Sequence, residues 1–375
     1  MRRIPGTMAV VAVVLSPLPA LARAPDFSAF DKAVKAQCAS GEFGGIVTVA
    51  VAGKPVYSHS CRGPFAPDAR FKIFSTGKLL TALAVMKLVE EGRMSLDAPV
   101  VTYVPDLPPL WRAVTVRQLL THTSGIHDHS DEFMENFKTD HASAMRGFLK
   151  RGDVRKAAPR RAPGAGYRYN NFGYELLADA AARVSGESFD KVLTRLVLRP
   201  AGMKDAVVEL GQGKGWRKSE TFTSVPDPRL VKGWNREFDG KQDQTVEAVS
   251  YSFIQLGAGA IHASMSDMLA LDRAIAGNRV VSARTWSMML DQKIAMSAAN
   301  PGAYYGLGVM VGDREGLPSH GHTGGVNGYI STFRRFPTKD TVVIALSNTG
   351  WAGTRWIETG AAAALADPKP PATGF

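Results

Sequence analysis

A serine and a lysine three residues apart, in Ser75-Thr-Gly-Lys78, are the residues of this sequence best suited to nucleophilic chemistry. A serine hydroxyl is unreactive at its ordinary pKa and needs a base within hydrogen-bonding reach. On a helix, residues three apart lie on one face, and burial would lower the pKa of the amine and free its lone pair. We therefore expect Ser75 to be a nucleophile and Lys78 its base. At a helix start, the N–H of Ser75 would also stabilise an oxyanion.

This spacing is not decisive by itself, because a chain of this length contains such a match by chance. A second match occurs at Ser188-Phe-Asp-Lys191. That one is typical of a helix N-cap followed by an exposed lysine. Two motifs farther along the chain distinguish the first match from the second.

The first of these motifs is Tyr169-Asn170-Asn171. The phenol of Tyr169 could pass protons, and the amide of Asn171 could bind both a substrate amide and the lysine. The alternative is a purely structural role, in which these polar side chains stabilise a turn. The neighbouring residues favour the functional interpretation.

The second motif is His322-Thr323-Gly324-Gly325, placed just before an expected strand at 328–336. A strand edge here could pair with an extended acyl chain. The N–H of Gly325 would then complete an oxyanion hole with that of Ser75. His322, Thr323, Gly324 and Gly325 are thus expected to bind substrate.

The arrangement of expected elements indicates how these motifs are brought together. We expect strands at both ends of the chain and mostly helices and loops between them. This pattern predicts an α/β domain from residues 25–98 and 280–375, with a mostly helical region at 99–279 inserted and a substrate cleft between the two. The elements expected are helices at 26–39, 76–91, 116–120, 174–184, 266–275 and 354–365 and strands at 45–52, 55–59, 305–311, 328–336 and 341–347.

The three motifs, in this order, resemble the serine β-lactamase-related family, which contains class C β-lactamases, D-alanyl-D-alanine carboxypeptidases, D-aminopeptidases and some esterases. The likeness extends along nearly all of the chain after residue 24, through 88–97, 119–126, Pro163-Gly164, Gly173-Tyr174 and 200–203. It implies an α/β (α+β) fold with an antiparallel sheet flanked by helices from both termini and an inserted helical domain.

The same resemblance implies roles for the motif residues. Ser75 is the nucleophile, Lys78 the base for acylation, Tyr169 a proton shuttle toward the leaving group, and Asn171 a ligand of substrate and lysine. Which of Lys78 and Tyr169 takes the serine proton stays open.

One departure concerns His322, because class C β-lactamases usually carry lysine there. Histidine at this position resembles peptidase and esterase members, and would be a weaker, pH-dependent cation. Activity would then change near the histidine pKa of roughly 6.5. A purely structural histidine is the alternative. The sequence has no Ser-Asp-Asn or Lys-Thr-Gly and no Gly-x-Ser-x-Gly, which argues against class A β-lactamases and α/β-hydrolases.

The first 24 residues read as a signal peptide, with Met-Arg-Arg, a short apolar run and cleavage after Ala22 or Ala24. The run is too short to span a bilayer. We expect a periplasmic or secreted protein without a transmembrane anchor. The sequence has two cysteines, Cys38 and Cys61. In an oxidising compartment they could form a disulfide, and the alternative is that they are two small buried side chains.

Composition is that of a globular chain, with 45% apolar and 21% charged residues and a net charge of +11. Loss of Arg2, Arg3 and Arg23 with the leader lowers the charge by three to +8, or to +9 if Arg23 stays. Scattered basic residues without aromatic interleaving argue against a nucleic-acid partner. One local cluster of basic residues comprises Arg151, Arg155, Lys156, Arg160 and Arg161. The favoured interpretation is a solvated loop, and the alternative is a site that binds a carboxylate.

We expect no metal and no cofactor. His122, His127 and His129 lie near Asp128, but on a polar loop without the spacing of a zinc site. His122 is more simply a packing or hydrogen-bonding residue.

These observations predict an exported serine hydrolase that cleaves amide or ester bonds through an acyl-enzyme. Peptides that contain D-amino acids, including fragments of peptidoglycan, are the leading substrates, since the basic cluster could hold a carboxylate. Short-chain esters or β-lactams, as for an esterase or a class C-like β-lactamase, are the next alternative. A different class of function is a β-lactam or cell-wall sensor that is acylated without turnover, which burst kinetics would reveal.

Overall fold

The computed structural model describes residues 25–135, 140–212, 223–224, 227–238, 243–247 and 255–366. The expected leader at 1–24 lies outside these residues. Within the described part of the chain, no helix is both long and apolar enough to cross a membrane.

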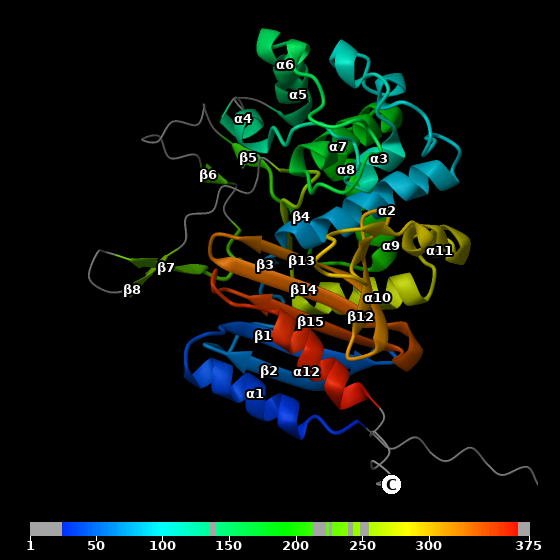
Figure 1. Cartoon of the computed structure of the whole chain (residues 1–375). Coiled ribbons are helices and arrows are strands. Elements are labelled where there is room, and N and C mark those ends of the chain that lie inside the picture. The colour runs from blue at the N-terminus through cyan, green and yellow to red at the C-terminus, as the bar shows by residue number, and fades with distance from the viewer. Residues whose placement is uncertain are drawn as a thin grey trace, which may run out of the picture.

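The centre of the fold is an eight-stranded antiparallel sheet of order β10-β11-β12-β13-β14-β15-β1-β2 (Figure 1). β1 pairs with β15, so the first strand of the chain lies beside the last. This confirms the antiparallel sheet expected from both chain ends. The strands are β1 (Gly45–Val51), β2 (Lys54–Cys61), β10 (Ile294–Ala295), β11 (Tyr304–Tyr305), β12 (Met310–Arg314), β13 (Leu317–Val326), β14 (Tyr329–Phe336) and β15 (Thr341–Ser347).

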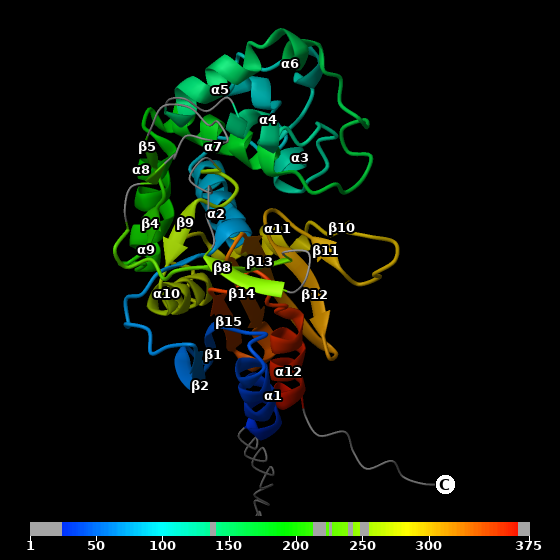
Figure 2. The same ribbon diagram turned by 90° about the vertical axis from the view of Figure 1, so that its left-hand side faces the viewer.

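The sheet is buried on both faces, which explains why all seven residues of β15 are buried. Successive side chains of a strand point to opposite faces. Val343 and Ala345 therefore join a cluster with α1 (Ser28–Ala39) and α12 (Arg355–Leu365). Val342 and Ile344 belong to the larger core on the other face. Figure 2 shows α1 and α12 side by side beneath the sheet.

The larger core surrounds α2 (Gly77–Glu90), which is apolar on nearly all sides and buried along most of its length. Most of the remaining helices lie above the sheet around α2 (Figure 1), whereas α10 packs on the sheet itself. These helices and single-turn segments are η2 (Val100–Thr102), η3 (Pro109–Trp111), α3 (Val116–Leu120), α4 (Ser130–Glu135), α5 (His141–Leu149), α6 (Gly152–Lys156), α7 (Asn171–Ser185), α8 (Phe189–Leu193), η4 (Thr194–Leu198), α9 (Arg199–Ala201), α10 (Met265–Ala276), α11 (Ala283–Asp291) and η6 (Pro337–Lys339). The expected domain boundaries at 98/99 and 279/280 stay a prediction.

Three smaller sheets complete the described fold. β3 (Phe71–Lys72), β9 (Ile261–Ala263) and β4 (Val207–Val208) form one of them, in the order β3-β9-β4. The other two are hairpins, β5 (Gly211–Gln212) with β6 (Thr223–Ser224) and β7 (Trp234–Phe238) with β8 (Asp243–Glu247).

Two sequence expectations need comment. Cys38 and Cys61, whose state the sequence left open, form a disulfide that joins α1 to the end of β2. His322-Thr323-Gly324-Gly325 lies within a strand of its own, β13, and not in a segment preceding a strand. Pairing with β14 along 320–326 holds this stretch extended.

Candidate active site

Ser75 lies in a single 3-10 turn, η1 (Phe74–Thr76), that leads directly into α2. The residue before it, Phe74, has a positive φ of 45°, a conformation that costs energy for a side chain of this size. Gly259 fits closely against this turn, because a Cβ built on it would lie 2.0 Å from the carbonyl oxygen of Phe74. The neighbouring turn thus holds the backbone that presents Ser75.

Lys78 is fully buried one turn after Ser75, and its Nζ atom lies 3.1 Å from the Ser75 hydroxyl oxygen. Two further oxygens accept from it, Oδ1 of Asn171 at 2.7 Å and the carbonyl of Ala258 at 3.0 Å. A neutral amine has two hydrogens and one lone pair. If Asn171 and Ala258 take the two hydrogens, the lone pair faces the hydroxyl of Ser75.

Burial lowers the pKa of Lys78 to about 7, while the charges of Glu175 and Asp128 oppose this fall. Desolvation disfavours the charged form of an amine, which is why the shift is downward. A substantial fraction of Lys78 is therefore neutral near pH 7, as a general base requires.

Tyr169 and Asn171 are placed by the start of α7. Asn170 is the N-cap of this helix, and its Oδ1 accepts the Gly173 N–H at 2.7 Å. The Tyr169 ring therefore precedes the helix and lies over the amine of Lys78, with Nζ 4.9 Å from the ring centroid. Burial raises the pKa of Tyr169, and a hydrogen bond with Ser75 partly opposes the rise.

The glycines of the third motif lie beside the serine turn. A Cβ built on Gly324 would be 2.9 Å from the backbone nitrogen of Ser75 and 2.1 Å from the carbonyl of Ile73, so only glycine permits this approach. Ser331 on β14 fastens the same turn by donating to the Ile73 carbonyl at 2.6 Å. β12 pairs with β13 only as far as Gly321. Beyond it, the described strands pair with β13 on the β14 side alone, which leaves an edge at Thr323 and Gly325.

His322 is placed differently from the expected substrate-binding cation. It is fully buried, its Nδ1 lies 2.6 Å from the Thr323 carbonyl, and its Nε2 lies 2.9 Å from the Tyr305 hydroxyl. Burial, followed by the charge of Lys78, lowers the pKa of His322 to about 3. The expectation of a pH-dependent cation is therefore wrong, because burial disfavours the charged ring and keeps it neutral above this value.

The other sequence candidates have contacts of their own. Ser188 is the N-cap residue of α8, and Lys191 is exposed. In the basic cluster, Arg151 pairs with Asp153 at 3.1 Å. Arg160 donates to Nε2 of His127 at 3.2 Å.

The loop histidines also behave differently from one another. His122 accepts the backbone N–H of Asn170 through Nδ1 at 3.1 Å, as expected of a hydrogen-bonding residue. His127, His129 and Glu132 bring one possible metal ligand atom each within 4.8 Å of the others. The guanidinium of Arg160 beside His127 opposes a second cation there.

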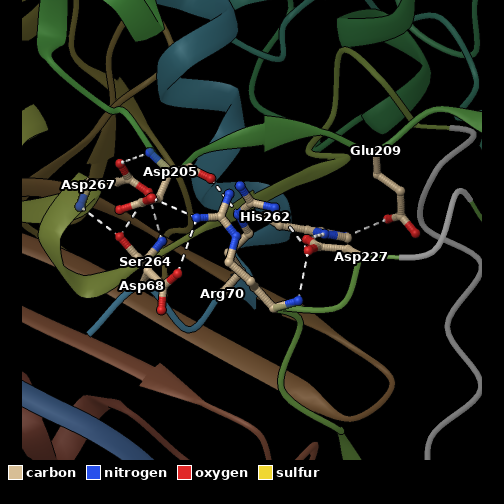
Figure 3. Close-up of polar contacts among 9 residues, drawn as sticks. Asp68, Arg70, Asp205, Glu209, Asp227, His262, Ser264 and Asp267 are labelled. Carbon is tan, nitrogen blue, oxygen red and sulfur yellow. Dashed lines mark hydrogen bonds and ion pairs between the residues drawn. The ribbon is translucent and has the colours of Figure 1, made fainter. Parts of the chain in front are cut away.

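A buried polar network lies behind the serine turn, between β3, β9 and β4 (Figure 3). Lys72 bridges to Glu209 at 2.7 Å, and His262 contacts Asp227 at 2.9 Å and Glu209 at 3.2 Å. Arg70 binds the other oxygen of Asp227 at 2.9 Å. The Ile73 N–H donates to the Ile261 carbonyl at 3.0 Å, so the strands that carry this network also support the residues before Ser75.

Sequence reasoning missed three groups near Lys78: the carboxylates of Asp128 and Glu175 and the carbonyl of Ala258. Asp128 binds the start of α7, and Glu175 binds the backbone at Gly257 and Ala258. Only Asp128 carried a signal in the sequence, because it closely follows the family-like segment 119–126.

Comparison with known proteins places this geometry in context. A protein-family model described as Beta-lactamase matches residues 30–366. A putative penicillin-binding protein, PbpX, of Bacillus subtilis is 30% identical over 285 residues, or 75% of this chain and 63% of that protein. Esterase EstB of Burkholderia gladioli is 30% identical over 154 residues, or 38% of this chain and 39% of that protein. The chain thus spans less than two thirds of either relative.

Among solved structures, a D-stereospecific amidohydrolase from a Streptomyces species superposes with a TM-score of 0.70 at 22% identity. The match covers 88% of this chain and 96% of that one. At this identity the likeness concerns the fold alone.

Proposed function

Because the chain belongs to the beta-lactamase family of serine hydrolases, we propose that it cleaves amide or ester bonds through an acyl-enzyme at Ser75. The observation that carries the proposal is the position of the buried Lys78 amine, 3.1 Å from the serine hydroxyl. Two carbonyl oxygens on its other sides, at 2.7 and 3.0 Å, leave its lone pair directed at that hydroxyl. A pKa of about 7 makes this amine an effective base near neutrality.

Acylation begins when the Ser75 oxygen bonds to the substrate carbonyl carbon and its proton passes to Nζ of Lys78. The carbonyl oxygen becomes an oxyanion that the N–H groups of Ser75 and Gly325 stabilise. Collapse of this intermediate breaks the bond to the leaving amine or alcohol. The leaving group takes the proton from Lys78 through the phenol of Tyr169.

Deacylation follows the same path in reverse, with water in place of the leaving group. Lys78 accepts the proton of the attacking water, either directly or through Tyr169, whose phenol gives its own proton to Lys78 as it takes the proton of the water. The bond from the acyl carbon to the Ser75 oxygen then breaks. Ser75 then recovers its proton from Lys78. The raised pKa of Tyr169 keeps its phenol protonated, so it can donate as well as relay a proton.

We infer that the substrates are small molecules or peptides containing D-amino acids. Two findings support this class: a penicillin-binding protein is among the relatives, and β13 offers an edge to an extended substrate backbone. A peptidoglycan origin of the substrate requires export. The expected leader and the Cys38–Cys61 disulfide are in keeping with a periplasmic or secreted enzyme.

The likeness to esterase EstB favours a second candidate, hydrolysis of short-chain esters. The same acyl-enzyme chemistry serves both, because an alcohol replaces the amine as leaving group. A sensor that is acylated but not deacylated remains the alternative of another class.

The test is to incubate the protein lacking residues 1–24 with a fluorophosphonate and, separately, with a fluorescent penicillin, and to locate adducts by peptide mass spectrometry. Labelling of Ser75 by both reagents supports a penicillin-recognising hydrolase, and D-alanyl peptides are assayed next. Labelling by the fluorophosphonate alone favours the esterase. If neither reagent modifies Ser75, the proposed function is wrong. A product burst without steady turnover identifies the sensor.

A further inference from the structure

We propose that Asp128 and Glu175 are paired positioning residues that hold the two acceptors of Lys78 in place and supply the negative charge around it. Neither carboxylate contacts Lys78 itself. Asp128 acts through Asn171, and Glu175 acts through the turn that carries Ala258. The proposal deepens the acyl-enzyme function and rests on it.

Asp128 determines which end of the Asn171 amide faces the lysine. Its Oδ2 accepts the backbone N–H of Asn171 at 3.1 Å and lies 3.4 Å from Nδ2 of the same residue. Its Oδ1 accepts the N–H of Phe172 at 3.0 Å. Because a carboxylate only accepts hydrogen bonds, the amide nitrogen turns toward Asp128 and the amide oxygen toward Lys78. With the amide reversed, two donors would face each other.

Glu175 performs the corresponding task on the other side of Lys78. It is fully buried on α7, and its two oxygens accept the N–H of Gly257 at 3.2 Å and of Ala258 at 2.8 Å. His141 contacts the same carboxylate through Nε2 at 2.9 Å. The turn held in this way directs the carbonyl of Ala258 at Lys78.

The two carboxylates also act on Lys78 through their charge. Burial lowers the pKa of Lys78, and the charges of Glu175 and then Asp128 oppose this effect. The other titratable groups near the amine are the rings of Tyr169 and Tyr174, at 4.9 and 5.6 Å from Nζ, and the buried His122 and His322. Burial raises the pKa of both tyrosines and lowers that of both histidines, so these four groups are neutral near pH 7.

A purely structural role is the competing explanation, since Asp128 caps α7 and Glu175 ties this helix to a turn. Loss of a cap lowers stability and rate without changing the titration of Lys78. Loss of the negative charge must lower the pKa of Lys78, because the ammonium form loses its stabilisation. The titration of Lys78 therefore distinguishes the two explanations.

The experiment follows the ¹³Cε resonance of Lys78 from pH 5 to 10 in protein labelled with ¹³C-lysine, with the signal assigned by its loss in Lys78→Arg. Asp128→Asn and Glu175→Gln are compared with matched controls, Asp131→Asn nearby on α4 and Asp179→Asn one turn further along α7. Asp128→Glu retains the charge with altered geometry. Asp128→Ser, whose hydroxyl can still accept a backbone N–H, replaces Asp128→Asn if that variant does not fold.

We expect the pKa of Lys78 to fall by about one unit in Asp128→Asn and in Glu175→Gln, and to stay within a few tenths of a unit in both controls and in Asp128→Glu. Labelling of Ser75 by a fluorophosphonate should slow at least tenfold in Asp128→Glu, because the Asn171 amide is displaced. Folded variants whose Lys78 titrates as in the wild type overturn the proposal. Failure of the proposed function is a separate result, seen as no Ser75 adduct in the wild type, because the resonance does not depend on catalysis.

Discussion

The hydroxyl of Tyr305 lies 2.9 Å from Nε2 of His322, in a part of the site that is fully buried. The other ring nitrogen donates to the Thr323 carbonyl at 2.6 Å, so Nε2 of the neutral ring is left to accept the tyrosine proton. This pair fixes the tautomer of His322 and makes it a support of β13. Lys78 is then the group of this site whose charge changes near neutral pH.

The pH dependence of acylation should therefore report Lys78 and not His322. Protonated Lys78 has no lone pair, so the rate of Ser75 labelling should rise with pH through a midpoint of about 7. His322→Asn should lower the plateau but leave the midpoint within a few tenths of a unit. The measurement is the fluorophosphonate rate constant from pH 5 to 9. A midpoint that vanishes in His322→Asn would restore the histidine as the titrating group.

Lys78→Arg replaces the base with a group that cannot accept a proton, since an arginine stays protonated in proteins. We expect acylation to slow by roughly 10²- to 10⁴-fold, the usual contribution of a general base. Ser75→Ala should abolish labelling entirely. The second Ser-x-x-Lys match offers the control, because Ser188→Ala and Lys191→Arg should label at the wild-type rate. A Ser75→Ala protein that turns over substrate normally would rule out the nucleophile.

Gly259→Ala should disturb the turn that carries Ser75, because Gly259 lies against the backbone of Phe74. The new Cβ would lie 2.0 Å from the Phe74 carbonyl oxygen, at a residue whose φ is +147°. We expect a loss of about 1–3 kcal/mol of unfolding free energy and slower Ser75 labelling. Gly92→Ala, also at positive φ but in open space, should cost about 1 kcal/mol and leave labelling unchanged. Chemical denaturation and labelling kinetics measure both effects, and equal labelling in the two variants would refute the close approach.

Much of this molecule could be predicted from the sequence because its signals are local. The long apolar segment of α2 and the short apolar run of β15 predicted a helix and a strand at nearly their observed bounds. The three motifs predicted the family, which the match over residues 30–366 confirms. Ser75, Lys78 and Asn171 are indeed adjacent, although their catalytic roles stay predictions.

The parts that escaped prediction depend on contacts between distant segments. Asp128 meets Asn171 across 43 residues, and Glu175 meets Gly257 across 82. No spacing rule links such pairs. The neutral state of His322 likewise depends on its burial beside Tyr305, which a motif does not encode. The extended form of β13 depends on pairing with β14 along 320–326 and with β12 as far as Gly321.

The buried network of Figure 3 should make stability depend on pH through His262. Burial by itself would lower the pKa of His262, but hydrogen bonds to Asp227 and Glu209 outweigh it and the net shift is upward. A histidine whose pKa is raised on folding stabilises the protein most where it is protonated in both states. Its contribution is therefore complete below about pH 6.5 and is lost as pH rises through the higher folded value.

Thermal unfolding of His262→Gln and wild type should show this difference directly. The drop in Tm caused by the substitution should be largest near pH 6 and shrink toward pH 9. The two carboxylate partners of His262 do not change charge between pH 6 and 9. Although burial opposes it, hydrogen bonds and nearby charges hold the pKa of Glu209 at about 2 and that of Asp227 below its usual value. His59→Gln on β2, outside the network, is the control for the loss of a histidine. A His262→Gln effect that is constant from pH 6 to 9 would mean that His262 is neutral in the folded protein, and that Lys72 and Arg70 alone balance the two carboxylates behind the serine turn.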